Sequence, residues 1–283
     1  MPRVPSLHTH SRYCDGAGDI QDYVAAAMAA GLPALGASSH APVPWATDYA
    51  MPLDRLPAYA AEVQRLRGVY AGRIDVYLGL ELDYRPGVMA FYRDVLAPYP
   101  FDYLIGSVHY VGELDDRPWA FEASPGVFAD GLARLYGGFT RRLVADYYAL
   151  VREAAQVPEV NILGHIDRIK MYNVGDRYFS EDAAWYRDAV EETLVAIAAS
   201  GKIVELNTSG WRKANPSPFP SPWIARRCAE LGIPMCLSGD SHTPQQVAYR
   251  FREGAALLRD AGHREVVGLV GGQWTPLELK VDG

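Results

Sequence analysis

Two histidines near the start of the chain are the first residues whose type and spacing indicate chemistry. His8 and His10 lie in the stretch SLHTHSRYCDGAGD (residues 6–19) and are separated by a single threonine. In an extended strand, alternate side chains point the same way, so both imidazoles would share one face and could bind a metal ion. Asp240 and His242 repeat this spacing near the other end of the chain. A His-x-His pair alone is weak evidence, so further ligands must come from elsewhere.

Short apolar runs recur along the chain and predict the strands that would position such ligands. They are PALGA (33–37), IDVYLGL (74–80), FDYLIG (101–106), VNILG (160–164), KIVEL (202–206) and IPMCLS (233–238), with a weaker run before His8. A histidine or a carboxylate follows most of these runs closely: His40, Glu81, His109, His165 and Asp240. Each of these candidate ligands therefore follows a different predicted strand.

Amphipathic segments alternate with the apolar runs. Helices are expected over residues 20–30, 128–155 and 181–200. Asp19 and Ser180 can cap the first and the last of them, and Gly137–Gly138 can interrupt the second. Alternating strands and helices predict an α/β fold with a parallel sheet. With about seven such units and no glycine-rich dinucleotide motif, we favour a closed or distorted barrel over an open sheet.

A barrel of this kind would bring the candidate ligands together. The carboxyl ends of all its strands open on one face, so six of the seven histidines would converge there. A single histidine at a strand end is more often a hydrogen-bonding loop residue, but six together favour a multinuclear metal site. Imidazole and carboxylate ligands suit zinc, iron and manganese, and a carboxylate can bridge two ions. The exception is His263, whose polar surroundings predict a solvated surface side chain.

Composition limits the classes of function. The 283 residues are 49% hydrophobic and 22% charged, which fits one domain over residues 1–283. The net charge of −7 argues against nucleic acid or anionic membranes as partners. The three cysteines are scattered and predict no disulfide framework, and no stretch has the character of a signal peptide or membrane span. We therefore expect a cytoplasmic protein.

Six ordered motifs resemble the PHP (polymerase and histidinol phosphatase) superfamily. They are the opening His-x-His, SSH (38–40), GLE (79–81), GSVH (106–109), GHID (164–167) and GDSH (239–242). ELNTSGWRK (205–213) and HAPVPW (40–45) resemble its histidinol-phosphate phosphatase branch. The resemblance spans nearly the whole chain and implies a distorted, TIM-like (β/α)7 barrel with a metal site at the carboxyl ends of the strands. It also implies hydrolysis of L-histidinol phosphate to L-histidinol and phosphate in histidine biosynthesis, by attack of a metal-activated hydroxide on phosphorus.

The resemblance also implies a site of three zinc, iron or manganese ions. The first ion would be held by His8, His10, Glu81 and Asp240. Glu81 would bridge to a second ion bound by His109 and His165, and the third would be held by His40, His242 and Asp15. Among these residues the resemblance assigns catalysis to Glu81, His109, Asp240 and His242.

Asp15 departs from the family pattern. Many relatives carry a histidine six residues after the second histidine of the opening pair, where this chain has Gly16. Asp15 is the available substitute. Its alternative role is that of a turn residue in an Asp-Gly pair.

Cationic residues near the motifs could bind the substrate phosphate. Arg168 and Arg212 are the first choices, because a guanidinium can hold phosphate with two hydrogen bonds. Lys170 and Lys213 are equally well explained as solvated loop charges. Asp167 could orient a metal ligand or form a turn. Three aromatic residues could line the imidazole end of the substrate, although packing is the commoner role: Tyr13, Trp45 and Trp211.

Two other functions remain open. The chain could be a PHP phosphoesterase that acts on another small phosphate monoester or on nucleotides, although its acidic composition disfavours polynucleotides. It could also be a PHP module kept for structure or regulation, but such modules lose metal ligands and nearly all are present here. The sequence leaves the native metal and the oligomeric state open.

Overall fold

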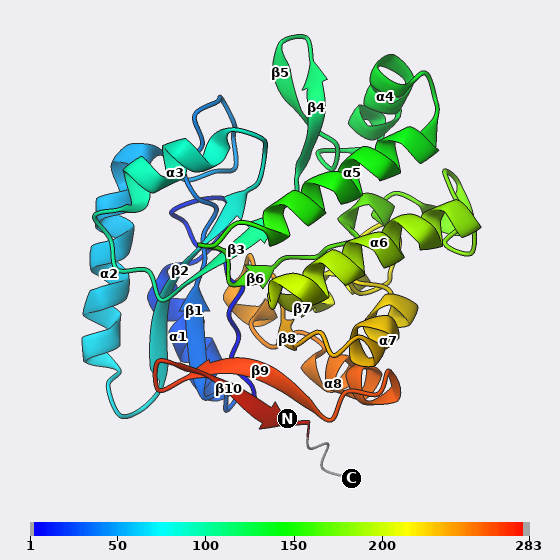
Figure 1. The fold of residues 1–283 in the computed structure, drawn as a ribbon. Helices are drawn as coiled ribbons and strands as arrows, with labels where there is room; N and C mark the ends of the chain where they lie inside the picture. Colours follow the sequence, from blue (N-terminus) through cyan, green and yellow to red (C-terminus); the bar gives the residue numbers. More distant parts are fainter. Residues whose placement is uncertain (1–2, 280–283) are drawn as a thin grey trace.

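The fold is built on a curled sheet of six parallel strands. The structure, a computed structural model, describes residues 3–279. The strand order is β1-β2-β3-β6-β7-β8, and adjacent strands are parallel throughout (Figure 1). The six strands are β1 (Ala34–Ala37), β2 (Asp75–Asp83), β3 (Tyr103–Ser107), β6 (Ile162–Leu163), β7 (Ile203–Asn207) and β8 (Met235–Ser238). Each of the six main apolar runs in the sequence is therefore confirmed as a strand.

The expected first strand is not a regular strand. Within residues 3–279 the curled sheet has six strands, so the seven-stranded count is not confirmed. Ser6 forms an isolated bridge with Leu35 of β1, and Thr9 forms one with Ser241 just beyond β8. The segment between them thus lies along both edges of the sheet. At Thr9 side chains replace the backbone partners: its N–H donates to the Ser38 hydroxyl (2.9 Å), and its own hydroxyl donates to the Gly36 oxygen (2.7 Å), so the ladder with β1 is interrupted.

Helices cover the outer face of the sheet (Figure 1). They are α1 (Ile20–Ala29), α2 (Leu56–Val69), α3 (Val88–Leu96), α4 (Pro125–Tyr136), α5 (Thr140–Ala155), α6 (Ala184–Ser200), α7 (Pro222–Glu230) and α8 (Phe251–Asp260). Short 3-10 helices span Leu53–Arg55, Arg168–Lys170, Val174–Asp176, Thr208–Arg212 and Pro244–Gln246. Among the described residues, no helix combines the length and the apolar character that a membrane span requires.

The helix boundaries follow the predicted signals in two of three cases. Asp19 is the N-cap of α1, as expected. Gly137 ends α4 in the left-handed region, with φ of 58°, and separates it from α5. The capping role predicted for Ser180 is wrong, because α6 begins only at Ala184. The Ser180 hydroxyl instead accepts a hydrogen bond from the backbone N–H of Asp182 (3.2 Å), so it stabilises a local turn.

Two hairpins that the sequence did not indicate lie at opposite ends of the sheet (Figure 1). The hairpin of β4 (Tyr110–Leu114) and β5 (Arg117–Ala120) directly follows His109. The hairpin of β9 (Glu265–Val270) and β10 (Gln273–Glu278) lies at the amino end. There the carboxylate of Asp75, the first residue of β2, accepts a hydrogen bond from the N–H of Gly271 (2.9 Å). The second hairpin therefore closes the amino end of the sheet.

The alternation of side chains along each strand separates two apolar cores. Leu78 and Leu80 of β2 face outward into the large core between sheet and helices. Tyr77 faces the other way, into a smaller core inside the curl. Tyr103 fills much of that interior, and a Cβ atom at Gly79 would lie only 2.4 Å from its ring. The same alternation carries Glu81 to the inside of the sheet at its carboxyl end.

Candidate metal centre and cavity

Glu81 lies at the centre of a buried cluster of histidines at the carboxyl end of the sheet. It is 1% exposed, and both of its oxygens face imidazole nitrogens. Oε1 lies 3.0 Å from His165 Nε2 and 3.5 Å from His109 Nε2. Oε2 lies close to three further nitrogens: His8 Nε2 (3.3 Å), His10 Nε2 (3.4 Å) and His40 Nδ1 (3.0 Å). One carboxylate thus connects ligands from both sides of the cluster.

Asp240 extends the cluster on the side of the opening histidine pair. Its Oδ1 lies 3.2 Å from His10 Nε2 and 3.7 Å from His8 Nε2. His8 and His10 therefore face one site together with Glu81, as the spacing of the sequence predicts. Within the described chain, His8, His10 and Glu81 form one set that could hold a metal ion, and Glu81, His109 and His165 form another.

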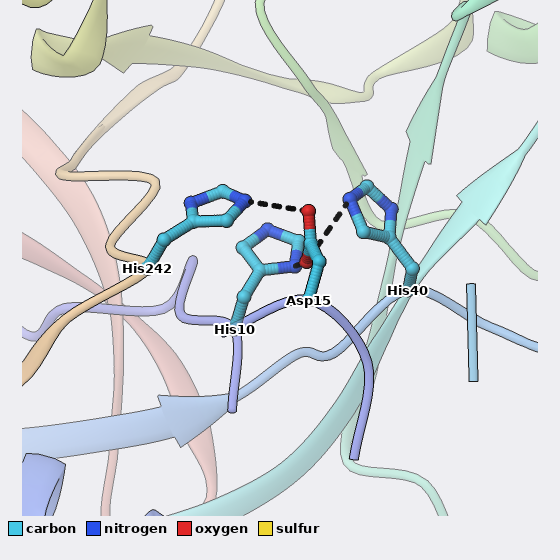
Figure 2. Close-up of side chains that lie close together, drawn as sticks. All are labelled: His10, Asp15, His40 and His242. Carbon is cyan, nitrogen blue, oxygen red and sulfur yellow. Dashed lines mark ion pairs between the residues drawn. The ribbon is translucent and has the colours of Figure 1, made fainter. Parts of the chain in front are cut away.

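A third set joins residues from three separate segments of the chain. His10, Asp15, His40 and His242 have ligand atoms that lie within 4.8 Å of one another (Figure 2). Asp15 Oδ2 is 3.4 Å from His242 Nε2, and its Oδ1 is 3.9 Å from His40 Nε2. A Cβ atom at Gly16 would lie 2.2 Å from the backbone oxygen of His10. This backbone therefore has no room for a side chain at residue 16, and Asp15, one residue earlier, places its carboxylate close to His242 and His40.

Carboxylates behind the cluster fix the orientation of two imidazoles. His8 Nδ1 is 2.6 Å from the buried Glu205 carboxylate, and His109 Nδ1 donates to Asp83. In both rings this contact occupies Nδ1 and directs Nε2 toward Glu81. Glu205 also accepts a hydrogen bond from the backbone N–H of His165 (2.9 Å), so it connects the two segments that carry His8 and His165.

Several inward-facing nitrogens have no hydrogen-bond partner, and this tests whether the residues fit metal ions. His8 Nε2, His10 Nε2 and His40 Nδ1 are all buried and unpaired. Leaving a buried polar group unpaired costs roughly 1–3 kcal/mol. Imidazole and carboxylate groups are the donors that zinc, iron and manganese accept. The donor set therefore fits metal ions, which would pair these nitrogens.

Backbone strain occurs at two residues of the cluster. His165 has φ of 26° and Asp240 has φ of 45°, and each lies two residues beyond the end of a strand. Residues other than glycine seldom occupy this region, and such strain tends to gather at functional sites. The placement of these two side chains in the cluster is therefore accompanied by conformational strain in the backbone at both residues.

The charges of the cluster favour ionised carboxylates. Burial would raise the pKa of the Glu81 carboxyl, but the surrounding imidazoles, above all that of His8, outweigh burial and hold this pKa well below its usual value. Burial likewise acts against the ionised form of Asp240, and His8 and His10 reverse that effect so that its pKa is also well below the usual value. Both side chains are therefore available as anionic ligands near neutral pH.

A cavity of about 1050 Å³ opens beside the cluster. One wall is the loop 45–49, which includes Trp45 and Tyr49, and another is the hairpin of β4 and β5. Arg212 and Lys213 line the cavity beside Asp240. Trp45 thus lines the cavity, the less common of the two roles considered for it, whereas Tyr13 and Trp211 are not among the lining residues.

The two predicted phosphate ligands have different surroundings. The Arg168 guanidinium is paired with Glu122 and also lies 3.1 Å from Asp240 Oδ2. Arg212 donates from one terminal nitrogen to the backbone oxygens of Gly239 (3.2 Å) and Asp240 (3.1 Å). Its other terminal nitrogen is buried and has no partner. Arg212 therefore has a donor to spare, while Arg168 is already engaged with two carboxylates.

Lys170 and His263 differ from the expectations, whereas Asp167 has one of its two expected roles, that of a turn residue, because its backbone oxygen accepts the N–H of Lys170 (3.1 Å). Lys170 is fully buried, pairs with Asp167 (2.8 Å) and donates to the backbone oxygen of Pro218 (2.8 Å). It is therefore neither a solvated loop charge nor a lining residue of the cavity. Asp167 accepts a hydrogen bond from the backbone N–H of Ser221 and so fastens a loop. His263 is half-buried with Nε2 2.9 Å from the oxygen of Ala225, so the prediction of a solvated side chain is wrong.

Sequence reasoning missed Asp83, Glu122 and Tyr49. Asp83 follows Glu81 by two residues in β2, so the alternation that placed Glu81 could also have found it. Glu122 lies just beyond β5, where no alternation of strands and helices predicts a site residue. Its Oε1 lies 3.8 Å from His109 Nε2. Tyr49 lies in a loop with no motif of its own.

The fold and the cluster together define a class: α/β proteins with a centre of imidazoles and carboxylates at the carboxyl ends of a curled parallel sheet. The model of the PHP domain matches residues 6–209, and this chain belongs to that family. The chain beyond the match supplies β8, Asp240 and His242 to the same cluster.

Relatives of nearly full length support this membership. "Probable histidinol-phosphatase" of Deinococcus radiodurans is 37% identical, over 94% of this chain and 96% of its own. "Histidinol-phosphatase" of Bacillus subtilis is 24% identical, over 86% of this chain and 95% of its own.

Two solved structures share the fold. A chain from Listeria monocytogenes has a TM-score of 0.79 at 22% identity, over 88% of this chain and 99% of its own. Histidinol phosphate phosphatase of Lactococcus lactis, complexed with zinc, L-histidinol and phosphate, has a TM-score of 0.75 at 21% identity, over 97% of this chain and 100% of its own.

Proposed function

We propose that this protein is a metal-dependent phosphatase that hydrolyses L-histidinol phosphate to L-histidinol and phosphate. The observation that carries the proposal is the position of Glu81, whose two oxygens face five imidazole nitrogens beside a cavity lined by cations. The substrate is inferred from the relatives, of which the Deinococcus radiodurans protein is 37% identical over nearly the whole chain.

Three metal ions would be held by this chain. His8, His10, Glu81 and Asp240 would hold the first, and Glu81 would bridge to a second on His109 and His165. Asp15, His40 and His242 would hold the third. Gly16 supports the role of Asp15, because a side chain there would clash with the backbone of His10. Residues 6–9, which bridge to both edge strands, would then take the seventh position of a (β/α)7 barrel.

The chemistry is divided between the ions and the protein. When bound, the ions would supply hydroxide near neutral pH and neutralise charge on the phosphate. Arg212 would donate its free terminal nitrogen to a phosphate oxygen that faces away from the ions. Lys213 lines the same part of the cavity and adds positive charge. Arg168 would act chiefly by holding Asp240 and Glu122 in place.

The opposite wall of the cavity suits the rest of the substrate. Trp45, Tyr49 and Tyr110 line it, and the rings of Tyr49 and Tyr110 are stacked with centroids 6.2 Å apart. Aromatic faces of this kind pack well against an imidazole ring. A small phosphate monoester with a flat leaving group therefore fits the cavity better than a polynucleotide, because the chain as a whole is acidic.

The whole chain would act as one unit in the cytoplasm. Asp240 and His242 reach the cluster from the last third of the sequence, so residues 1–283 would form a single catalytic domain. The three cysteines are free, which fits a reducing compartment.

A substrate panel tests the proposal. Phosphate release would be measured with L-histidinol phosphate, nucleoside monophosphates and p-nitrophenyl phosphate under identical metal conditions. We expect the highest kcat/KM for L-histidinol phosphate. A nucleotide that is hydrolysed as efficiently or better would contradict the assignment and favour a general phosphoesterase of the same family.

A further inference from the structure

Tyr49 connects the wall of the cavity to the metal centre. Its ring lines the cavity and packs edge-on against His40, with ring centroids 4.6 Å apart. Its hydroxyl turns away from the cavity and donates a hydrogen bond to Asp83 Oδ2 (2.8 Å). Tyr49 therefore contacts one proposed ligand directly and reaches a second through Asp83.

Asp83 has both oxygens engaged. Oδ1 accepts the N–H of His109 Nδ1, and Oδ2 accepts the hydroxyl of Tyr49. The side chain is 1% exposed, so water does not compete for these contacts. Asp83 lies close to His40 and His109 and could be taken for a ligand. However, Oδ1 lies against His109 Nδ1 and Oδ2 against the Tyr49 hydroxyl, so the contacts of this carboxylate favour orienting His109.

We propose that Tyr49 is a positioning residue for the metal centre, acting through Asp83 on His109. The Tyr49 hydroxyl fixes the rotation of the Asp83 carboxylate, and the carboxylate in turn holds His109 Nε2 toward Glu81. Removing a group that contacts a ligand directly, as Asp83 contacts His109, typically changes metal affinity about 10- to 100-fold. The proposal deepens the proposed function and rests on His109 being a metal ligand.

The loss of one hydroxyl tests this role. Tyr49→Phe keeps the ring that lines the cavity and removes only the hydrogen bond to Asp83. Tyr84→Phe is the matched control, because its hydroxyl points to Glu153 (3.0 Å) and its position directly follows Asp83 in the sequence. Both variants and the parent would be loaded with zinc, and the transfer of zinc to a chromophoric chelator would be followed over time.

We expect Tyr49→Phe to release a fraction of its zinc at least about 10-fold faster than the parent, and Tyr84→Phe to match the parent. At saturating zinc, KM for L-histidinol phosphate should stay unchanged, because the ring remains. Parental zinc release by Tyr49→Phe would overturn the proposal. So would a raised KM with parental zinc release, which would make Tyr49 a cavity wall only.

A double-mutant cycle checks the route through Asp83. Asp83→Asn should itself speed zinc release, and adding Tyr49→Phe should then have little further effect, because the connection is already broken. If the effects of the two substitutions on zinc release were fully additive, Tyr49 would not act through Asp83. If Asp83→Asn does not fold, the comparison of Tyr49→Phe with Tyr84→Phe decides alone. Zinc release needs no substrate, so its outcome is separate from failure of the proposed phosphatase activity.

Discussion

The interior of the curled sheet has two ends that the same strands build in opposite ways. At the amino end, Tyr77 and Ile203 join a small apolar core, which the hairpin of β9 and β10 covers. At the carboxyl end, the same two strands present Glu81 and Glu205 to a ring of histidines. A step of four positions along β2, from Tyr77 to Glu81, thus leads from a closed apolar core to a buried polar cluster.

The two ends differ in whether their buried groups have partners within the protein itself. Apolar side chains gain from burial alone, so the amino end is complete without a ligand. The carboxyl end keeps His8 Nε2 and His10 Nε2 buried and unpaired. Such a cluster reduces stability until a ligand pairs its nitrogens. We conclude that the amino end is built for stability and the carboxyl end for binding, and substitutions at the two ends should separate these properties.

The largest expected effect is that of Glu81→Ala. Because Glu81 would bridge two ions, its loss should remove metal and lower activity by more than about 100-fold, the upper end for residues that merely orient ligands. Metal content per chain and phosphate release would be measured together. Glu62→Ala is the control, because Glu62 lies on α2 and forms its ion pair with Arg65 (2.8 Å). Near-parental metal content and turnover in Glu81→Ala would refute the cluster assignment.

Arg212→Ala should have the next largest effect and should leave the metal in place. Hydrogen bonds to charged groups are worth roughly 1.5–3 kcal/mol, so kcat/KM should fall by about one to two powers of ten. Arg212→Lys should also be impaired, because an ammonium lacks the paired donors of a guanidinium. Inhibition by inorganic phosphate should weaken in parallel. Parental kcat/KM and parental phosphate inhibition would exclude Arg212 from the site.

Asp15→Ala separates the third set of proposed ligands from the other two sets at the carboxyl end. If Asp15 replaces the histidine of the family pattern, the variant should bind about one ion fewer, because it serves only the third set of ligands. Elemental analysis of the purified variant and parent would measure this. Unchanged stoichiometry and kinetics would mean that Asp15 is a turn residue.

Leu269→Ala is the converse test at the amino end. Leu269 is 2% exposed in the small core. Removing a buried leucine side chain typically costs about 2–5 kcal/mol, so the midpoint of denaturant unfolding should fall. Metal content and kcat/KM at low temperature should stay at parental values, the smallest functional change expected here. A loss of metal with unchanged stability would contradict the conclusion that the amino end serves stability and the carboxyl end serves binding.

The strands and the ligands at their ends could be predicted from the sequence because both depend on local pattern. An apolar run followed by a histidine needs no knowledge of distant contacts, and His109 and His165 were found in this way. The capping role of Ser180 failed for a different reason: a competing local contact with Asp182 forms a turn before α6 begins.

The partners behind the ligands depend on tertiary contacts. Asp83 and Tyr49 meet although 34 residues separate them, and Arg168 meets Glu122 from 46 residues away. No spacing rule connects such pairs. The hairpin of β4 and β5 is also an insertion into the alternation of strands and helices, so the cavity wall that it provides could not be anticipated.

The most direct test of the central claim is phosphate release from L-histidinol phosphate after chelation and defined metal add-back. The chelated protein should be folded but inactive, and zinc, manganese or iron(II) should restore activity in proportion to the ions bound at the cluster. Restoration should fail in Glu81→Ala. A thoroughly chelated, metal-free protein that hydrolyses L-histidinol phosphate at the parental rate would contradict the account.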